Sequence, residues 1–247
     1  MYTTSVCLAK WAAGFFILFI LSGSTPLFAP IFVPSSGDYR IFQDNALLDI
    51  SNVSDGYIKV QYKGAVPLIV VRVEKPALGL HYDYHIIPNG NWKVLPLTMG
   101  SGTYNIFVLE HMYGRMFRIL INTSVEVSLS NYLYPFLYPN VYVNFHAGSA
   151  AVARARSLAQ NAADELEILN RIYYYIVSSI SYDNDLAQYI LNTPNLVHIT
   201  DIDRTLEVGS GICLDFSALM AAMLRSLHIP ARLEFRRPVH IDAGSWY

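Results

Sequence analysis

The residue of this sequence best suited to covalent chemistry is Cys213, which follows the segment Gly209-Ser-Gly-Ile212. Apolar residues come after it at helical spacing, at positions 216, 219, 220, 223, 224 and 227, and Pro230 ends the pattern. The spacing predicts a largely buried helix with Cys213 in its first turn. A helix N-terminus lowers the pKa of a thiol and favours the nucleophilic thiolate. A second interpretation stays open, because small buried cysteines are also common core residues.

The start of this helix has its own polar signals. Ser210 is the expected N-cap, and Asp215 lies in the first turn, where a negative charge suits the helix dipole. Glycines at 209 and 211 let the chain approach this end closely. These residues predict a helix end built to place Cys213.

The stretch around the cysteine has a known counterpart. Its sequence, Gly-Ile-Cys-x-Asp-Phe-Ser-Ala-Leu-Met-Ala-Ala-Met-Leu-Arg-Ser and then Ile-Pro-Ala-Arg232, closely resembles the core motif of the transglutaminase-like superfamily. Ile180-Ser-Tyr-Asp183 and the segment from Leu137 to Asn144 are similar to segments of bacterial exported members with an N-terminal β-domain. One departure is His228, where the family usually has a glycine that reaches positive φ freely.

The resemblance implies a papain-like core and acyl transfer. Cys213 would be the nucleophile, and a histidine and an aspartate on the following sheet would be its base and its orienting residue. The substrate would be a protein or peptide amide, in some members associated with the cell wall, and the acceptor would be an amine or water. The sequence indicates no metal or cofactor site. A calcium requirement, known in animal members of the family, is not indicated, because no spaced acidic loop is present.

The family pattern stops after the strand expected from Ala231 to Phe235. A His-Ala-Trp motif is expected downstream, but the sequence has Pro238, which is awkward in a paired strand, and then His240 and Asp242. His240 is therefore a poor candidate for the base. We expect an incomplete core over residues 148–247, truncated or frameshifted after about residue 236, with little or no turnover. The alternative is a non-catalytic cell-surface binding or scaffold protein that retains the fold.

Residues 1–34 have the pattern of an export signal. Lys10 precedes an apolar run from Trp11 to Leu21, and small residues offer cleavage after Ser24 or Ala29. If the segment stays uncleaved, residues 11–33 would anchor the chain in a membrane. Either outcome predicts an extracytoplasmic protein. Cleavage would remove Cys7, so Cys213 would be the one cysteine of the mature chain.

Residues 35–130 have the pattern of a β-sandwich-like domain. Short runs alternate apolar with polar residues and are separated by turn residues rich in glycine. The expected strands cover residues 57–62, 68–74, 82–86, 103–109, 117–121 and 124–129. With the helical region that follows, the expected fold class is α+β.

An aromatic segment and then helices follow the β region. Residues 131–147, with Tyr132-Leu-Tyr-Pro-Phe-Leu-Tyr-Pro139, predict an extended linker whose rings pack across a domain boundary, or else bind carbohydrate. Helices are expected from Ala150 to Gln160, from Glu165 to Ile180 with Asp164 as the cap and Leu166 on the buried face, and from Asp201 to Leu206.

The composition of the chain bears on which classes of binding partner are indicated. Charged residues make up 15% of the chain and the net charge is −2, so no nucleic acid or other polyanion partner is indicated. His81, His85 and His111 are interpreted as surface or turn residues, because no third ligand accompanies the pair on one strand face.

Overall fold

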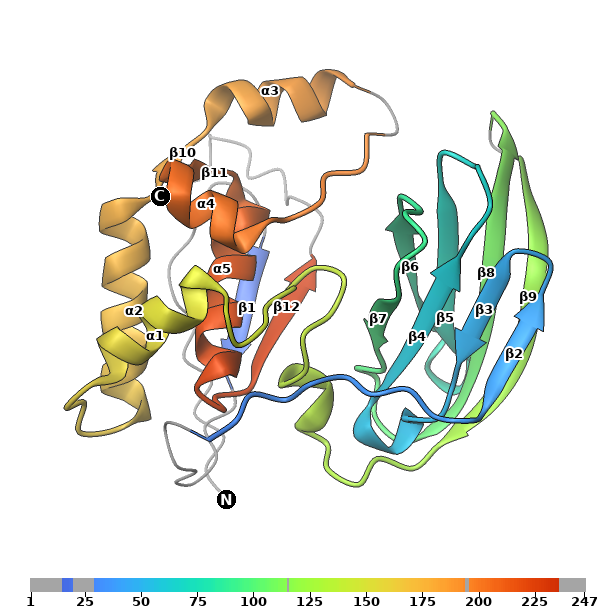
Figure 1. Cartoon of the computed structure of the whole chain (residues 1–247), viewed down its shortest axis with the longest axis horizontal. Coiled ribbons are helices and arrows are strands. Elements are labelled where there is room, and N and C mark those ends of the chain that lie inside the picture. The colour runs from blue at the N-terminus through green and yellow to red at the C-terminus, as the bar shows by residue number, and fades with distance from the viewer. Residues whose placement is uncertain (1–14, 20–28, 115, 194–195, 236–247) are drawn as a thin grey trace, which may run out of the picture. The chain divides into compact units, whose positions relative to one another are not determined.

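The computed structural model describes residues 15–19, 29–114, 116–193 and 196–235 (Figure 1). It confirms the α+β class, with an antiparallel β region followed by helices. Within the described residues, 32–114, 116–141 and 196–199 form one compact unit, the β unit. Residues 15–19, 29–31, 142–193 and 200–235 form the other, the helical unit.

The β unit contains two four-stranded antiparallel sheets. One has the strand order β2-β3-β4-β7, and the other has the order β6-β5-β8-β9. The strands of the first are β2 (Arg40–Gln43), β3 (Ala46–Asp49), β4 (Tyr57–Tyr62) and β7 (Lys93–Pro96). Those of the second are β5 (Ile69–Lys75), β6 (Leu80–Ile86), β8 (Gly102–Tyr113) and β9 (Met116–Val127). Both sheets bury aliphatic side chains completely, among them Leu48, Ile58, Val71 and Ile106.

The strand predictions were correct for the longer strands and incomplete for the short ones. Residues 57–62 form β4 as expected. The two strands expected at 117–121 and 124–129 are one strand, β9, because Asn122 and Thr123 stay paired with Phe107 and Ile106 of β8. Strands β2, β3 and β7 were not predicted, because each has four residues and shows too little alternation.

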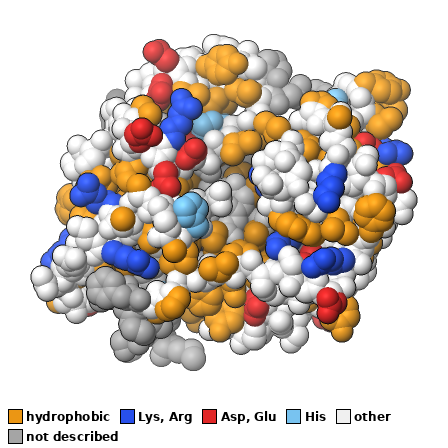
Figure 2. Space-filling view, viewed as in Figure 1, with side chains coloured by type: hydrophobic (Ala, Val, Ile, Leu, Met, Phe, Trp, Pro, Cys, Tyr) orange, Lys and Arg blue, Asp and Glu red, His pale blue; other side chains and the backbone are white. Residues whose placement is uncertain are grey.

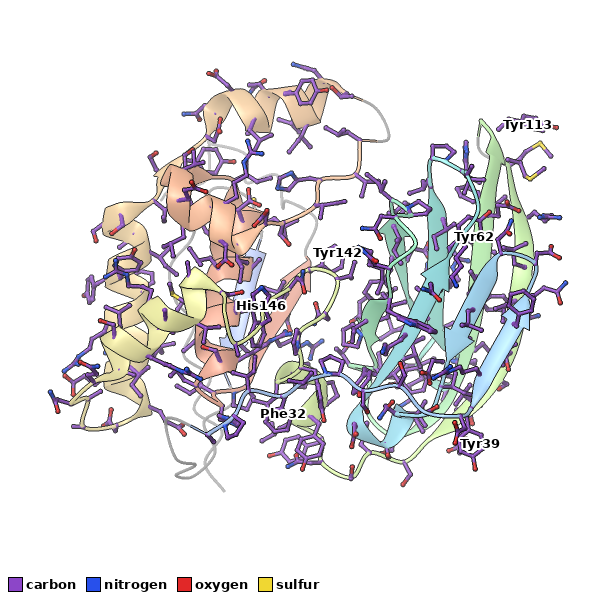
Figure 3. The ribbon with its side chains drawn as sticks, viewed as in Figure 1. Phe32, Tyr39, Tyr62, Tyr113, Tyr142 and His146 are labelled. Atoms are coloured by element: carbon purple, nitrogen blue, oxygen red, sulfur yellow. The ribbon has the colours of Figure 1, made fainter. Side chains whose placement is uncertain are left out.

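A polar network ties the two sheets together. The Tyr62 hydroxyl of β4 donates a 2.5 Å hydrogen bond to Oε1 of the buried Glu110 on β8. Arg118 of β9 donates to Oε2 of the same carboxylate at 2.6 and 2.9 Å. Burial and the neighbouring carboxylate raise the pKa of Tyr62 to about 12, while its hydroxyl and Arg118 hold the pKa of Glu110 below its ordinary value. Figure 3 labels Tyr62 within this unit.

The aromatic segment after β9 packs on the β unit. It forms a 3₁₀ turn, η3 (Tyr134–Phe136), where extended chain was expected, because proline's fixed φ suits the first position of a helical turn. The Tyr138 ring lies 4.7 Å from Tyr57 of β4 and 5.0 Å from Phe32, centroid to centroid. These rings therefore add to the core of the β unit.

The helical unit surrounds one buried helix. Its helices are α1 (Ala150–Ala159), α2 (Glu165–Ser179), α3 (Asn184–Asn192), α4 (Ile202–Val208) and α5 (Cys213–Ser226). Every residue of α5 except Ser217 is buried, and α1, α2 and α4 contact it. After α5, strand β12 (Ala231–Phe235) pairs antiparallel with β1 (Phe15–Phe19). None of the helices in the described ranges is long and apolar enough to cross a membrane.

Aspartates begin three of these helices. Asp164, Asp183 and Asp201 each accept a hydrogen bond from a backbone N–H three residues further on, at 2.8–3.1 Å. The prediction of Asp164 as a cap is confirmed. The predicted buried face of α2 was wrong at one position, because Leu166 is exposed and Ile168 is buried in its place.

Candidate functional site

Cys213 is the first residue of α5, as the sequence predicts, but the cap is not Ser210. Ser210 belongs to β11 (Ser210–Gly211), and the Ile212 N–H instead donates a 2.9 Å hydrogen bond to Oδ2 of Asp215. Asp215 is only 4% exposed. A Cβ at Gly211 would come within 2.8 Å of the Asp215 Cβ, so the glycine leaves room for this carboxylate.

The segment at residues 180–183 and the cysteine stretch that starts at Gly209 meet immediately before Cys213. β10 (Ser181–Tyr182) pairs in parallel with β11, and this register places Tyr182 opposite Gly211. The backbone N–H of Ser181 donates to the Gly209 carbonyl at 2.8 Å, and that of Asp183 donates to the Gly211 carbonyl at 2.9 Å. The structure therefore brings the segment at 180–183 to the start of α5.

Tyr182 is the aromatic neighbour of the thiol. Its ring meets that of Phe216 edge-on, at 6.2 Å between centroids and 69° between planes. Phe216 lies three residues after Cys213, so the two share one face of α5. Burial and the charge of the nearby thiolate both raise the pKa of the Tyr182 phenol. Cys213 is 9% exposed and Tyr182 is 40% exposed.

The expectation of a lowered thiol pKa was wrong. Burial raises the pKa of Cys213 above its ordinary value, and the negative charge of Asp215 raises it further. The backbone N–H groups of Leu214 and Cys213 lower the pKa, as a helix start should, but burial is the larger effect. The sequence indicated that Cys213 lies at a helix start, but it could not show how deeply the thiol is buried, and burial decides the direction of the pKa shift.

Within the described part of the helical unit, no histidine is among the groups that shift the pKa of the thiol. The groups that interact with Cys213 there are the two N–H groups, Asp215 and Tyr182. His228 follows the opposite end of α5, about 22 Å away at 1.5 Å per residue. His146 precedes α1, where its Nδ1 accepts a hydrogen bond from Gly148 (Figure 3). The candidate base His240, like Asp242, lies outside the described residues.

The far end of α5 has two features that bear on β12. His228 has a φ of +63°. This is the left-handed conformation expected at a position where the similar family usually has glycine. Arg225 is buried, and its Nε and Nη2 donate to the Ala231 carbonyl at 3.0 and 2.7 Å. Burial lowers the pKa of Arg225 to about 9. In the sequence, a single arginine within the apolar stripe of α5 is the signal that this helix fixes the start of β12.

Elsewhere the polar side chains form no comparable centre. His81 and His85 are both exposed on β6, and the described part of the chain has no group of three or more His, Cys, Asp or Glu residues suited to hold a metal ion. On the face shown in Figure 2, basic and acidic side chains are interspersed.

Comparison with known proteins gives one family. A model of the transglutaminase-like superfamily matches residues 152–245, a range that includes Cys213, His240 and Asp242. No curated protein matches the chain. Among solved structures, the fn3 domain of the human collagen alpha-1(XX) chain is 16% identical over 40% of this chain and 93% of that chain. Its TM-score is 0.27, and a likeness at that level carries no argument.

Proposed function

We propose, on the premise that residues 152–245 belong to the transglutaminase-like superfamily, that this protein is an exported enzyme acting on protein or peptide amides through a cysteine nucleophile. The observation that carries the proposal is the place of Cys213. It begins a buried helix at the point where the two segments similar to that family come together.

The proposed reaction has two steps. The Cys213 thiolate attacks the amide carbonyl, the C–N bond breaks, and the amine leaves with a proton while a thioester forms. An amine or a water molecule then attacks the thioester and releases the thiol. The first-turn N–H groups of α5 have no partner within the helix and can hold the oxyanion. Because burial raises the pKa of the thiol, a base must take its proton. His240 follows β12 within the matched range and is the histidine to test, although Pro238 before it argues against this role and turnover is expected to be low.

We also propose that residues 1–34 direct export, with cleavage after Ser24 or Ala29, or else retention of residues 11–33 as an anchor. The enzyme would then act on extracytoplasmic proteins or on peptides of the cell wall. N-terminal sequencing of the exported protein distinguishes the two forms. A chain that begins at Met1 would exclude cleavage.

A non-catalytic surface protein is the second candidate. The raised pKa of Cys213 favours it, because a thiol kept protonated is a poor nucleophile. A scaffold function would require only the packing of α5 and its neighbours. It predicts a thiol that alkylating reagents reach only after unfolding.

The test is release of ammonia from a glutamine-containing peptide, with and without a primary amine. Cys213→Ala should abolish release, and His240→Ala should do so if His240 is the base. His146→Ala is the matched control, because this exposed histidine lies before α1 and should leave release unchanged. No release, together with a thiol that resists iodoacetamide in the folded protein, would favour the scaffold.

A further inference from the structure

The backbone on either side of Tyr182 is hydrogen-bonded to the segment from Gly209 to Gly211. The Ser181 N–H before it donates to the Gly209 carbonyl, and the Asp183 N–H after it donates to the Gly211 carbonyl of β11. The Ser181 hydroxyl adds a 3.1 Å bond to the Gly209 carbonyl. The position of Tyr182 relative to the start of α5 is therefore fixed from both sides.

The side chain of Tyr182 extends over the thiol face of α5. Its ring rests edge-on against Phe216, which is itself part of the buried core. Opposite Tyr182, Gly211 has no side chain, and the space in front of it is taken by the carboxylate of Asp215. Tyr182 is 40% exposed, whereas the neighbouring thiol of Cys213 is 9% exposed. The accessible surface beside the thiol is thus partly an aromatic ring.

We propose that Tyr182 is a specificity-determining residue of the Cys213 site, a wall that binds acyl donors with an aromatic or flat apolar group next to the reactive carbonyl. The inference rests on the proposed function. Aromatic rings stack offset or edge-to-face, and such contacts favour a flat group over a small one beyond the effect of buried area. The nearby carboxylate of Asp215 disfavours acidic donors at the same place.

The test compares two neutral alkylating reagents that share a leaving group, iodoacetamide and its N-phenyl derivative. Their rate constants with Cys213 are measured on the folded protein, the labelled peptide is identified by mass, and each rate is divided by that for glutathione. The normalised preference for the phenyl reagent should fall roughly threefold to tenfold in Tyr182→Ala, the factor expected for an aromatic contact. Tyr182→Phe should keep the preference. Tyr189→Ala, at an exposed tyrosine of α3, is the matched control and should also keep it.

The outcomes separate this inference from the proposed function. A preference that is equal in wild type and Tyr182→Ala, with Cys213 still alkylated, overturns the inference and leaves the nucleophile in place. Equal acceleration of both reagents in Tyr182→Ala would make the ring a simple shield and also overturns it. A folded wild-type thiol that reacts with neither reagent overturns both proposals. Loss of the preference in Tyr182→Ala with retention in Tyr182→Phe supports the inference.

Discussion

Replacing Asp215 by asparagine should lower the pKa of Cys213. The carboxylate accepts from the Ile212 N–H at 2.9 Å, and its charge raises the pKa of the thiol. Asparagine keeps an oxygen that can accept the same hydrogen bond and removes the charge. The thiolate should therefore form at lower pH, and alkylation should begin at lower pH than in the wild type.

The free energy of unfolding of two Asp215 variants separates the effect of the Asp215 charge from the effect of its hydrogen bond to the Ile212 N–H. Asp215→Ala leaves the buried Ile212 N–H without its acceptor and should lower the free energy of unfolding by about 2 kcal/mol. Asp215→Asn keeps that acceptor but buries an amide group, so we expect a loss of about 1 kcal/mol. Both variants lack the charge. Both should therefore lower the thiol pKa, although only the alanine variant loses the cap.

The assay is the rate of iodoacetamide alkylation of the folded protein as a function of pH, with urea unfolding measured in parallel. Asp185→Asn is the matched control, because this exposed acid lies in the first turn of α3 and does not act on the thiol. Its profile should match the wild type. If the Asp215→Asn profile stays unchanged or moves to higher pH, the charge of Asp215 does not govern the thiol and the reasoning fails.

Three further changes test the fold. Gly56→Ala should lower the free energy of unfolding by about 3 kcal/mol in urea, because φ is +81° and the new Cβ would lie 2.4 Å from Pro135. The control Gly90→Ala is also at positive φ but in open space, so it should cost only about 1 kcal/mol. The pKa of Glu110 is lowered in the fold, so its contribution to the free energy of unfolding is present above the unfolded pKa and is lost as pH falls through the folded pKa. Glu110→Gln should therefore flatten the dependence of stability on acidic pH. An unchanged slope would contradict the lowered pKa of Glu110. His228→Gly should be about 1 kcal/mol more stable than His228→Ala, since φ is +63°, and equal stabilities would mean that no strain is stored there.

Sequence patterns predicted what depends on neighbours along the chain. The spacing after Cys213 placed α5 almost to the residue, because a helix buried on nearly all sides shows long apolar periodicity. The Asp164 cap was predictable for the same local reason. The strand β3, with four residues, offered no comparable signal.

The contacts that define the candidate site depend on distant segments. Ser210 has the chemistry of an N-cap, but it pairs with β10 as part of β11. Ile212 takes the N-cap position instead, and its N–H donates to Asp215 in the first turn. The approach of Tyr182 to Cys213 follows from the same pairing, which no spacing within either segment reveals. The raised thiol pKa follows from burial by the surrounding helices, and residue types near a helix start cannot give its extent.

If residues 1–34 direct export, as we propose, the pairing of β1 with β12 would set export and folding in competition. β1, at Phe15–Phe19, lies within the apolar run that we propose as the signal, and its partner strand is synthesised about 220 residues later, roughly ten to forty seconds at ordinary elongation rates. A chain captured early would then give its leader to the export machinery before β12 exists. A chain completed first can pair the leader into its own sheet and hide it. The rate of capture relative to synthesis would then decide how many molecules leave the cytoplasm.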